Sequence, residues 1–371
     1  MDPARGGGKD LNRESDQAGG RLGYKGRYSN IGLDLGSSRI KFIQFRGNRG
    51  RIQVHRYGIY WLPGGTIEGG RIVDPVLLAS RLRWFLNRRS LYKNRVNLSI
   101  SRQSVILRQI FLPPMSSREL ADAVRWEAKK QVMVPLDQVV LDYLSLGERR
   151  VGERQLIEVV LVSVPKEVVE GYIRAITGAG FYPAAIEIEP FALQRSLYYL
   201  QEPFRHREGA GLLMLDLGSE SSTLLVLEGG RYSFSRTIPV GVNHFCRHLV
   251  EKGGMDKEMA LRLILRGDPG SQVGVMEVAG ELAAQIKKTM DYYAHELGHS
   301  GKTFTRLFYC GGGAGIKGLW PFLERALGIA PRLFNPLTFL SQERRLLCSP
   351  LQAEGDLLAV AQGLALRGWV T

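Results

Sequence analysis

Two short segments, about half a chain apart, contain the residues best suited to bind a phosphate group. They are Asp34-Leu35-Gly36-Ser37-Ser38 and Asp216-Leu217-Gly218-Ser219, and each lies between two apolar runs. This pattern predicts a β-hairpin whose turn can lie against an anion, because glycine lets backbone N–H groups approach closely and the hydroxyls add donors. An aspartate repels phosphate but can hold a hydrated Mg²⁺ that bridges to it. The repetition predicts a nucleotide held between duplicated domains.

A third glycine-rich segment, Gly311-Gly312-Gly313, follows a predicted strand over 306–310 and precedes a predicted helix over 319–327. A strand, a glycine turn and a helix N-terminus together form a nucleotide-binding element. Residues 313–318 also fit the GxGxxG pattern, but residues 331–340 offer no acid to hold the ribose of a dinucleotide. We therefore expect the three glycines to lie against a base and a ribose.

Glu189 opens a predicted helix over 189–200 that joins the two halves of the chain. A carboxylate at this position can orient a water molecule toward a γ-phosphate. The same glutamate, followed by Pro190, also favours the start of a helix without any catalytic role. Both interpretations can hold together.

Two other strings match known motifs without meeting their requirements. His295-Glu296-Leu297-Gly298-His299 matches the HExxH of zinc proteases, which needs a continuing helix that carries both histidines. Gly298 and Gly301 favour the end of a helix here, so we do not expect zinc. Gly301-Lys302-Thr303 resembles the end of a P-loop, but position 296 is glutamate where that motif needs glycine.

The basic charge of the chain is concentrated near its N-terminus. The formal net charge is +14; residues 29–113 carry fifteen basic and three acidic side chains, whereas residues 114–371 carry 29 of each. The basic segment predicts either a solvated face or a surface for an anionic membrane or an acidic partner. We expect no specific nucleic-acid partner, because no motif that reads DNA or RNA accompanies the charge.

The remaining composition predicts a cytoplasmic protein. No apolar run reaches the roughly 18–20 residues that cross a bilayer. Cys246, Cys310 and Cys348 show no pairing pattern, which favours a reducing compartment. Residues 1–28 are rich in Gly, Asp, Arg and Ser, and this composition predicts a disordered tail.

Strand and helix patterns divide the rest of the chain. Residues 29–112 form the first part of the first half, and Leu112-Pro113-Pro114 breaks the pattern. A capping box from Ser116 to Glu119 then begins a helix, and further strands and a helix complete an α+β insertion at 113–185. We assign 186–209 to the first half, as its connecting helix, and 210–371 to the second half, with a helical part at about 246–304.

These motifs resemble those of the actin-like ATPase superfamily, which includes actin, DnaK-type chaperones, sugar kinases and the division protein FtsA. The resemblance implies an α/β fold, with two lobes of duplicated ribonuclease-H-like domains around ATP and Mg²⁺. Asp34 and Asp216 would be the metal ligands and, together with Glu189, the catalytic residues. The cofactor would be bound by residues of the two phosphate motifs and the adenosine motif, which are Gly36, Ser37, Ser38, Lys41, Gly218, Ser219, Gly311, Gly312 and Gly313.

Within the superfamily, the insertion resembles the FtsA-type α+β subdomain of the PilM family of type IV pilus assembly proteins. Met115-Ser116-Ser117-Arg118-Glu119 and Val164-Pro165-Lys166-Glu167-Val168-Val169 carry part of this likeness, which spans about 29–345. It implies a cytoplasmic scaffold, peripheral to the inner membrane, that captures the N-terminal tail of the membrane protein PilN. The candidates to line the groove for that tail are Trp126, Met133, Val134, Pro135 and Tyr143.

The sequence leaves several points open. We expect ATP binding with weak or no ATPase activity. PilM-like chains usually carry Glu-Ile-x-Arg beside the adenosine, whereas this chain has Gln285-Ile286-Lys287-Lys288, so we expect an adenosine contact from Lys288 without the carboxylate. A small-molecule kinase of the same fold is an alternative, although no further acidic motif offers a base for its substrate. An FtsA-like filament is another, but Ala365–Thr371 is too short for a membrane helix of that kind; a homo-oligomer is compatible with the sequence.

Overall fold

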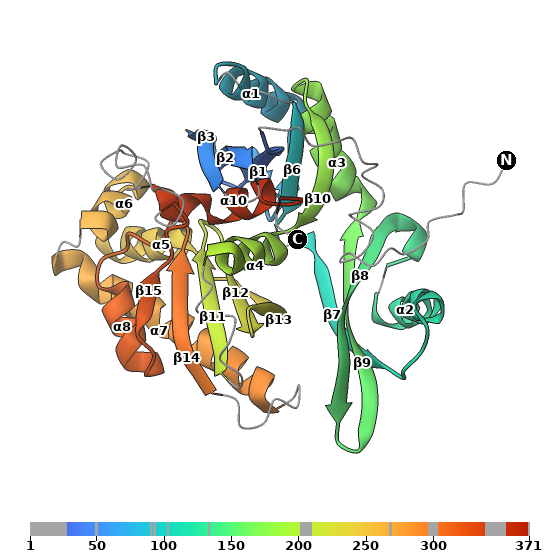
Figure 1. Cartoon of the computed structure of the whole chain (residues 1–371). Coiled ribbons are helices and arrows are strands. Elements are labelled where there is room, and N and C mark those ends of the chain that lie inside the picture. Colours follow the sequence, from blue (N-terminus) through green and yellow to red (C-terminus); the bar gives the residue numbers. More distant parts are fainter. Residues whose placement is uncertain are drawn as a thin grey trace.

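The computed structural model describes residues 28–48, 51–89, 91, 94–101, 104–132, 134–200, 210–266, 269–295, 303–337 and 354–369. Two lobes, each built on a mixed sheet, lie next to each other, and a smaller sheet projects from the first lobe (Figure 1). The predicted disordered tail, except for Tyr28, lies outside the described residues. So do residues 296–302, with most of the HExxH string.

The first sheet has the strand order β3-β2-β1-β6-β10. Its first three strands are antiparallel neighbours, whereas β6 and β10 run parallel to β1. Every residue of β1 is buried, because helices cover both faces of the sheet. The strands are β1 (Ile31–Leu35), β2 (Arg39–Asn48), β3 (Arg51–Trp61), β6 (Arg95–Ile100) and β10 (Tyr182–Ile188), and a small hairpin of β4 (Ile67–Glu68) and β5 (Arg71–Ile72) precedes α1 (Pro75–Asn87).

The second sheet repeats this arrangement with the order β13-β12-β11-β14-β15. Its first three strands are again antiparallel, and β14 and β15 run parallel to β11. The elements are β11 (Ala210–Leu217), β12 (Ser222–Glu228), β13 (Arg231–Ile238), α5 (Val242–Gly253), α6 (Lys257–Arg266), α7 (Pro269–His295), β14 (Thr303–Cys310), α8 (Leu319–Leu327) and β15 (Pro331–Leu333). The shared strand order confirms the predicted actin-like α/β fold of duplicated domains.

The inserted subdomain is a sheet of order β7-β9-β8 covered by α2. Leu120, Val124 and Ala128 of α2 are buried against this sheet and form a core separate from that of the first lobe. The capping box is present: the Ser116 N–H donates to the Glu119 carboxylate at 2.8 Å. The elements are β7 (Ile106–Leu112), α2 (Ser117–Gln131), the 3₁₀ turn η3 (Leu136–Gln138), β8 (Val139–Val151) and β9 (Arg154–Pro165).

The inserted sheet and its helix differ from the predicted insertion at 113–185 at both boundaries. Strand β7, which we assigned to the first half, pairs with β9 of the inserted sheet. In contrast, β10 pairs with β6 of the first sheet, and α3 (Lys166–Gly178) packs against α1. The apolar patterns predict these strands and this helix correctly, but such a pattern does not encode which sheet a strand joins.

The helices α4 (Glu189–Leu200) and α10 (Ala359–Ala365) pack together at the first sheet. A Cβ on Gly363 would lie 1.8 Å from the Ala192 carbonyl oxygen, and one on Gly32 of β1 would lie 1.9 Å from the Ala361 carbonyl oxygen. These close approaches require glycine. Residues 359–365, which we assigned to the second half, thus pack against β1 of the first lobe.

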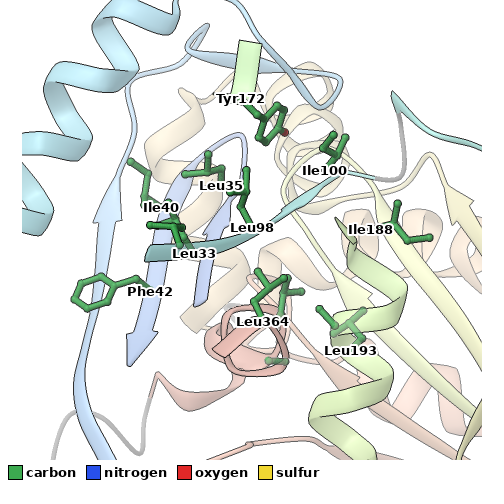
Figure 2. Close-up of a cluster of buried hydrophobic side chains, with 14 of the residues drawn as sticks. Leu33, Leu35, Ile40, Phe42, Leu98, Ile100, Tyr172, Ile188, Leu193 and Leu364 are labelled. Carbon is green, nitrogen blue, oxygen red and sulfur yellow. The ribbon is translucent and has the colours of Figure 1, made fainter. Parts of the chain in front are cut away.

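The core of the first lobe joins these elements. Figure 2 shows Leu33, Leu35, Ile40 and Phe42 of the first hairpin beside Leu98 of β6, with the ring of Tyr172 at one end of the cluster. Residues of α4 and α10 belong to the same buried cluster, so the helix pair is anchored to the first sheet. Among the residues that the structure describes, no helix combines the length and apolar character needed to cross a bilayer.

Candidate functional site

The two phosphate-binding turns have the same backbone geometry. The Gly36 N–H donates to the Arg39 carbonyl at 3.0 Å, and the Gly218 N–H donates to the Ser221 carbonyl at 3.1 Å. In each hairpin the aspartate lies two residues before the glycine, at the end of a buried strand. The sequence predicts this local geometry because all the residues that form each turn are contiguous.

Side chains of the two turns meet across the cleft between the lobes. The hydroxyl oxygens of Ser37 and Ser219 lie 2.7 Å apart, a hydrogen-bond distance. Next to them, the Gly69 N–H of the small β4–β5 hairpin donates to the Glu220 carboxylate at 3.1 Å. Both contacts join the first lobe to the second, so a group that enters between the turns must separate them.

The hairpins differ at the position opposite the aspartate. Asp34 lies opposite Lys41 in the first hairpin, and the Lys41 Nζ is 2.5 Å from the Asp34 carboxylate. In the second hairpin, Asp216 lies opposite Thr223, whose hydroxyl donates to Glu189 at 3.4 Å. The Lys41 ammonium lies near three carboxylates, those of Asp34, Asp216 and Glu189.

These groups shift each other's protonation. Burial alone would lower the pKa of Lys41, but the carboxylates of Asp34, Asp216 and Glu189 outweigh it and hold the pKa above its ordinary value. Burial raises the pKa of Asp216 to about 6; Lys41 opposes the rise, and Asp34 adds to it. The lysine thus stays charged, while the buried negative charge around it is only partly compensated.

The glycine cluster lies directly against the second turn. Gly311 has φ +90°, and a Cβ there would lie 2.1 Å from the Asp216 carboxylate oxygen. A Cβ on Gly313 would collide with the side chain of Leu217, whereas one on Gly312 would meet only Arg39 Nη1 at 3.7 Å. Gly311 and Gly313 are therefore required for close packing, and Gly312 leaves space open.

A cavity of about 200 Å³ lies between the lobes where these elements converge. Its lining includes most of the predicted site residues, namely Asp34, Gly36, Ser37, Ser38, Lys41, Glu189, Asp216, Gly218, Ser219, Gly311 and Gly312. Gly313 lies behind this lining, against Leu217. Lys288 is exposed on α7 and is not among the lining residues, so no adenosine contact from it is visible.

Sequence reasoning missed several residues of this site. Arg39 lines the cavity with its guanidinium 3.9 Å from the centre of the Trp61 ring. Burial raises the pKa of Asp356 to about 6, and the Asp356 carbonyl accepts a hydrogen bond from the Gly311 N–H at 3.1 Å. Asp356 precedes α10 just as Glu189 begins α4, so the repeat of the two halves is the signal that could have indicated it. Leu261 and Leu265 of α6 add an apolar wall.

A second cavity, also about 200 Å³, separates the inserted sheet from the first lobe. Its walls come from alternate residues of β8, from β9, from the end of β10 and from α4. Most of the lining is apolar, and Glu187, Arg195 and Arg367 form an ion cluster on its wall. We call this cavity the groove; the residues that line it are Ile100, Val140, Asp142, Leu144, Val162, Val164, Val169, Ile186, Glu187, Ile188, Phe191, Gln194, Arg195 and Arg367.

The residues that we predicted for a partner groove lie elsewhere in the insertion. Tyr143 is buried in the insertion core, and Trp126 is exposed on α2 with the Lys130 ammonium over its ring. Val134 and Pro135 are not among the residues that line the groove, and Met133 lies outside the described residues. On β8, neighbouring residues point to opposite faces, so Tyr143 faces the core while Asp142 and Leu144 face the groove.

Comparison with known proteins identifies the family of the chain. The sequence model of the family described as type IV pilus assembly protein PilM matches residues 32–369. A chain of the solved PilM–PilN type IV pilus biogenesis complex is similar, with 27% identity and a TM-score of 0.81, over 93% of this chain and 100% of that chain. The ethanolamine utilization protein EutJ from Carboxydothermus hydrogenoformans shares the fold, with 16% identity and a TM-score of 0.55, over 91% of this chain and 89% of that one.

Proposed function

The chain belongs to the PilM family of type IV pilus assembly proteins, and we propose that it is an ATP-binding scaffold whose groove holds the tail of a PilN-like inner-membrane protein. The family match over residues 32–369 supports the role in pilus assembly. The chain would then act in the cytoplasm, held at the inner membrane by this partner. ATP would set the conformation of the scaffold, with weak or no hydrolysis.

The observation that carries the partner proposal is the position of the groove between two edge strands. In the described part of the chain, β8 is the outer strand of the inserted sheet and β10 is the outer strand of the first sheet. An edge strand presents unpaired backbone N–H and C=O groups to which an extended peptide can pair. A disordered tail that enters the groove could therefore add a strand to either sheet.

The lining of the groove fits an extended and mostly apolar tail. Val140, Asp142 and Leu144 alternate along β8, so their side chains point to the same face. Val140 remains 43% exposed although it is aliphatic, so it offers an apolar contact to a peptide in the groove. Apolar pockets between alternate residues would give the specificity, and backbone pairing would give affinity.

The cavity between the lobes suits ATP with Mg²⁺. The N–H groups and hydroxyls of the two turns, with Lys41, can bind phosphate oxygens. Asp34 and Asp216 would hold a hydrated Mg²⁺, which binds proteins through one or two carboxylates and otherwise through water and phosphate. Burial raises the pKa of Asp216 and the Asp34 carboxylate adds to the rise, so a cation there would stabilise the charged form of the Asp216 carboxylate. Glu189, which lines the same cavity, would orient a water molecule toward the γ-phosphate.

The nucleotide proposal is tested by heat stability. Saturating ATP with Mg²⁺ should stabilise the chain, by about 2.7 kcal/mol at a hundredfold excess over the Kd. Asp34→Ala and Asp216→Ala should remove this gain, whereas Asp122→Ala, an exposed carboxylate on α2, should retain it. An unchanged thermal shift in the first two variants would contradict the site. Phosphorylation of small molecules by the chain would favour the kinase alternative instead.

The partner proposal is tested by peptide binding. A peptide copied from the N-terminus of the PilN-like protein encoded with this chain should bind, and Val140→Arg should weaken it at least tenfold, because an arginine there occupies the groove. Val134→Arg is the matched control, since Val134 is 36% exposed but outside the groove. Fluorescence anisotropy measures both affinities. Equal losses in the two variants would count against the groove.

A further inference from the structure

The outward face of α1 combines positive charge with exposed apolar side chains. The exposed arginines of this helix and its C-terminal end are Arg81, Arg83, Arg88 and Arg89. No aspartate or glutamate occurs in the sequence from residue 75 to residue 118, a stretch that contains nine basic residues. This helix therefore carries part of the basic charge of the N-terminal half. Figure 1 shows α1 at the outer edge of the first lobe.

The apolar side chains lie on the same face of the helix. Val76 is 81% exposed and Trp84 is 49% exposed. They are eight residues apart, so they lie about 80° apart around the helix axis, on its solvent side, and about 12 Å apart along it. The Trp84 ring is held between Tyr60, with ring centres 5.6 Å apart, and the Arg88 guanidinium, 4.7 Å from its centre. Trp84 is thus kept at the surface in one position.

The basic surface continues from α1 to the start of two strands. Arg83 donates a hydrogen bond to the Gly178 carbonyl at the end of α3, which connects α1 to the segment leading into β10. At the first residue of β10, the ring of Tyr182 is 57% exposed and lies 5.2 Å from the Arg95 guanidinium of β6. We define Val76, Arg81, Trp84, Arg88, Arg95 and Tyr182 as the α1 surface.

The part of this surface that contains Arg95 and Tyr182 lies at the opposite end of its strands from the groove. Arg95 and Tyr182 begin β6 and β10, whereas Ile100 and Ile188, which end the same two strands, line the groove. A ligand bound at that end of the α1 surface therefore leaves the groove accessible.

We propose that the α1 surface docks on an anionic phospholipid bilayer. Arginines bind lipid phosphates, and an aromatic ring with an apolar body and a polar tip favours the boundary between headgroups and acyl chains. Burial of the exposed Val76 side chain at that boundary is favourable, whereas a nucleic-acid backbone offers it no apolar contact. Lipid therefore fits this surface better than DNA or RNA. The inference rests on the proposed function, because the PilN-like partner would keep the chain beside the inner leaflet.

The test is flotation of the full chain with vesicles. The wild type should bind vesicles that contain phosphatidylglycerol more tightly than vesicles of phosphatidylcholine, and salt should weaken the binding. Each arginine at an anionic surface contributes about a fivefold gain, so the double variant Arg81→Ala/Arg88→Ala should bind about 25-fold more weakly. The matched control, Arg247→Ala/Arg332→Ala, removes two exposed arginines of the second lobe and should bind like wild type. Equal losses in both double variants would overturn the proposal.

A second measurement locates the contact. Brominated phospholipids should quench the fluorescence of Trp84. The chain has five tryptophans, and the difference in quenching between wild type and Trp84→Phe gives the contribution of this ring alone. Identical quenching in both proteins would overturn the proposal. So would displacement from the vesicles by duplex DNA or RNA whose binding depends on Arg81 and Arg88.

The tail-peptide assay separates this inference from the proposed function. The double variant Arg81→Ala/Arg88→Ala should keep its melting temperature and its affinity for the tail peptide while losing vesicle binding. If the wild type binds vesicles through the α1 surface but binds no tail peptide, the partner proposal fails and the lipid surface stands.

Discussion

Ile188 and Glu189 are joined by one peptide bond, yet they line two different cavities. Ile188, the last residue of β10, lines the groove, and Glu189, the first residue of α4, lines the cavity between the lobes. Ile100 and Ser101 repeat this relationship at the end of the neighbouring strand β6. The groove and the cavity between the lobes therefore lie next to each other, on either side of the ends of β6 and β10.

This adjacency predicts that the nucleotide and the tail peptide affect each other's binding. A shift of the strand ends on ATP binding changes the wall of the groove, and allosteric coupling of this kind typically alters affinity roughly 5- to 150-fold. The Kd of the peptide, measured with and without saturating ATP and Mg²⁺, should change by the same factor as the Kd of ATP measured with and without peptide. Asp216→Ala should remove the effect. A peptide Kd that ignores ATP in the wild type would refute the coupling.

Gly311 and Gly312 should respond differently to the same substitution. Gly311→Ala places a methyl group against Asp216 at a φ of +90°, where the backbone conformation alone costs roughly 1–3 kcal/mol. Its unfolding temperature should fall and its response to ATP should be lost. Gly312→Ala, with open space beside it, should keep its unfolding temperature and lose only ATP affinity. Differential scanning calorimetry with and without ATP distinguishes the two, and equal stability of the variants would be inconsistent with the packing described.

Lys41 should be essential for nucleotide binding, although it is not a metal ligand. Lys41→Gln removes the cation from the three carboxylates and from the phosphate side of the cavity, so the stabilisation by ATP should fall by about 2 kcal/mol or more, within the range for a lost charged hydrogen bond. The control is Lys257→Gln, at the start of α6, which also lines the cavity. Isothermal titration calorimetry gives both affinities, and an equal loss in the two variants would speak against a special role for Lys41.

Glu187 should stabilise the first lobe in a pH-dependent way. Its carboxylate accepts hydrogen bonds from Arg195 at 2.6 Å and from Arg367 at 2.5 Å. Burial opposes its charge, but the two arginines outweigh burial and lower its pKa. The unfolded chain then binds more protons in acid, so this stabilisation is complete above the ordinary glutamate pKa of about 4.3 and is lost as the pH falls through the lowered value.

The corresponding variant, Glu187→Gln, should therefore cost about 3 kcal/mol near neutral pH, because two arginines lose their buried partner. The difference in unfolding free energy between variant and wild type should shrink below pH of about 4. Urea unfolding at a series of pH values measures it. Glu170→Gln, whose carboxylate forms an exposed pair with Arg174, is the control and should change stability little. A constant difference across the acid range would contradict the assignment.

The sequence allowed the two hairpins to be predicted because each is a local structure. The aspartates, glycines and hydroxyls that face the cavity are contiguous in each turn, and apolar runs mark the strands around them. The capping box at Ser116 was likewise visible from two residues three positions apart. The assignment of Asp34, Asp216 and Glu189 to metal binding and catalysis stays a prediction, although the structure gathers their carboxylates around one cavity.

The features that the sequence did not reveal depend on long-range contacts. Asp356 reaches the site because α10 returns to the first sheet from the far end of the chain. Val140 and Leu144 alternate along β8 like any half-buried strand, and they line a groove only because β10 ends opposite them. Lys288 is exposed on α7 and is not among the residues that line the cavity, and its adenosine contact stays a prediction.

The difference between the two hairpins at the position opposite the aspartate has a consequence for how a ligand can be oriented. A clamp with two equivalent halves would accept an elongated anion in either direction. Here one half presents the lysine ammonium and the other presents a threonine hydroxyl at the equivalent position. The two halves therefore offer a phosphate group different partners, an ammonium in the first lobe and a hydroxyl in the second. Duplication accounts for the shape of the clamp, and divergence at one position gives it polarity.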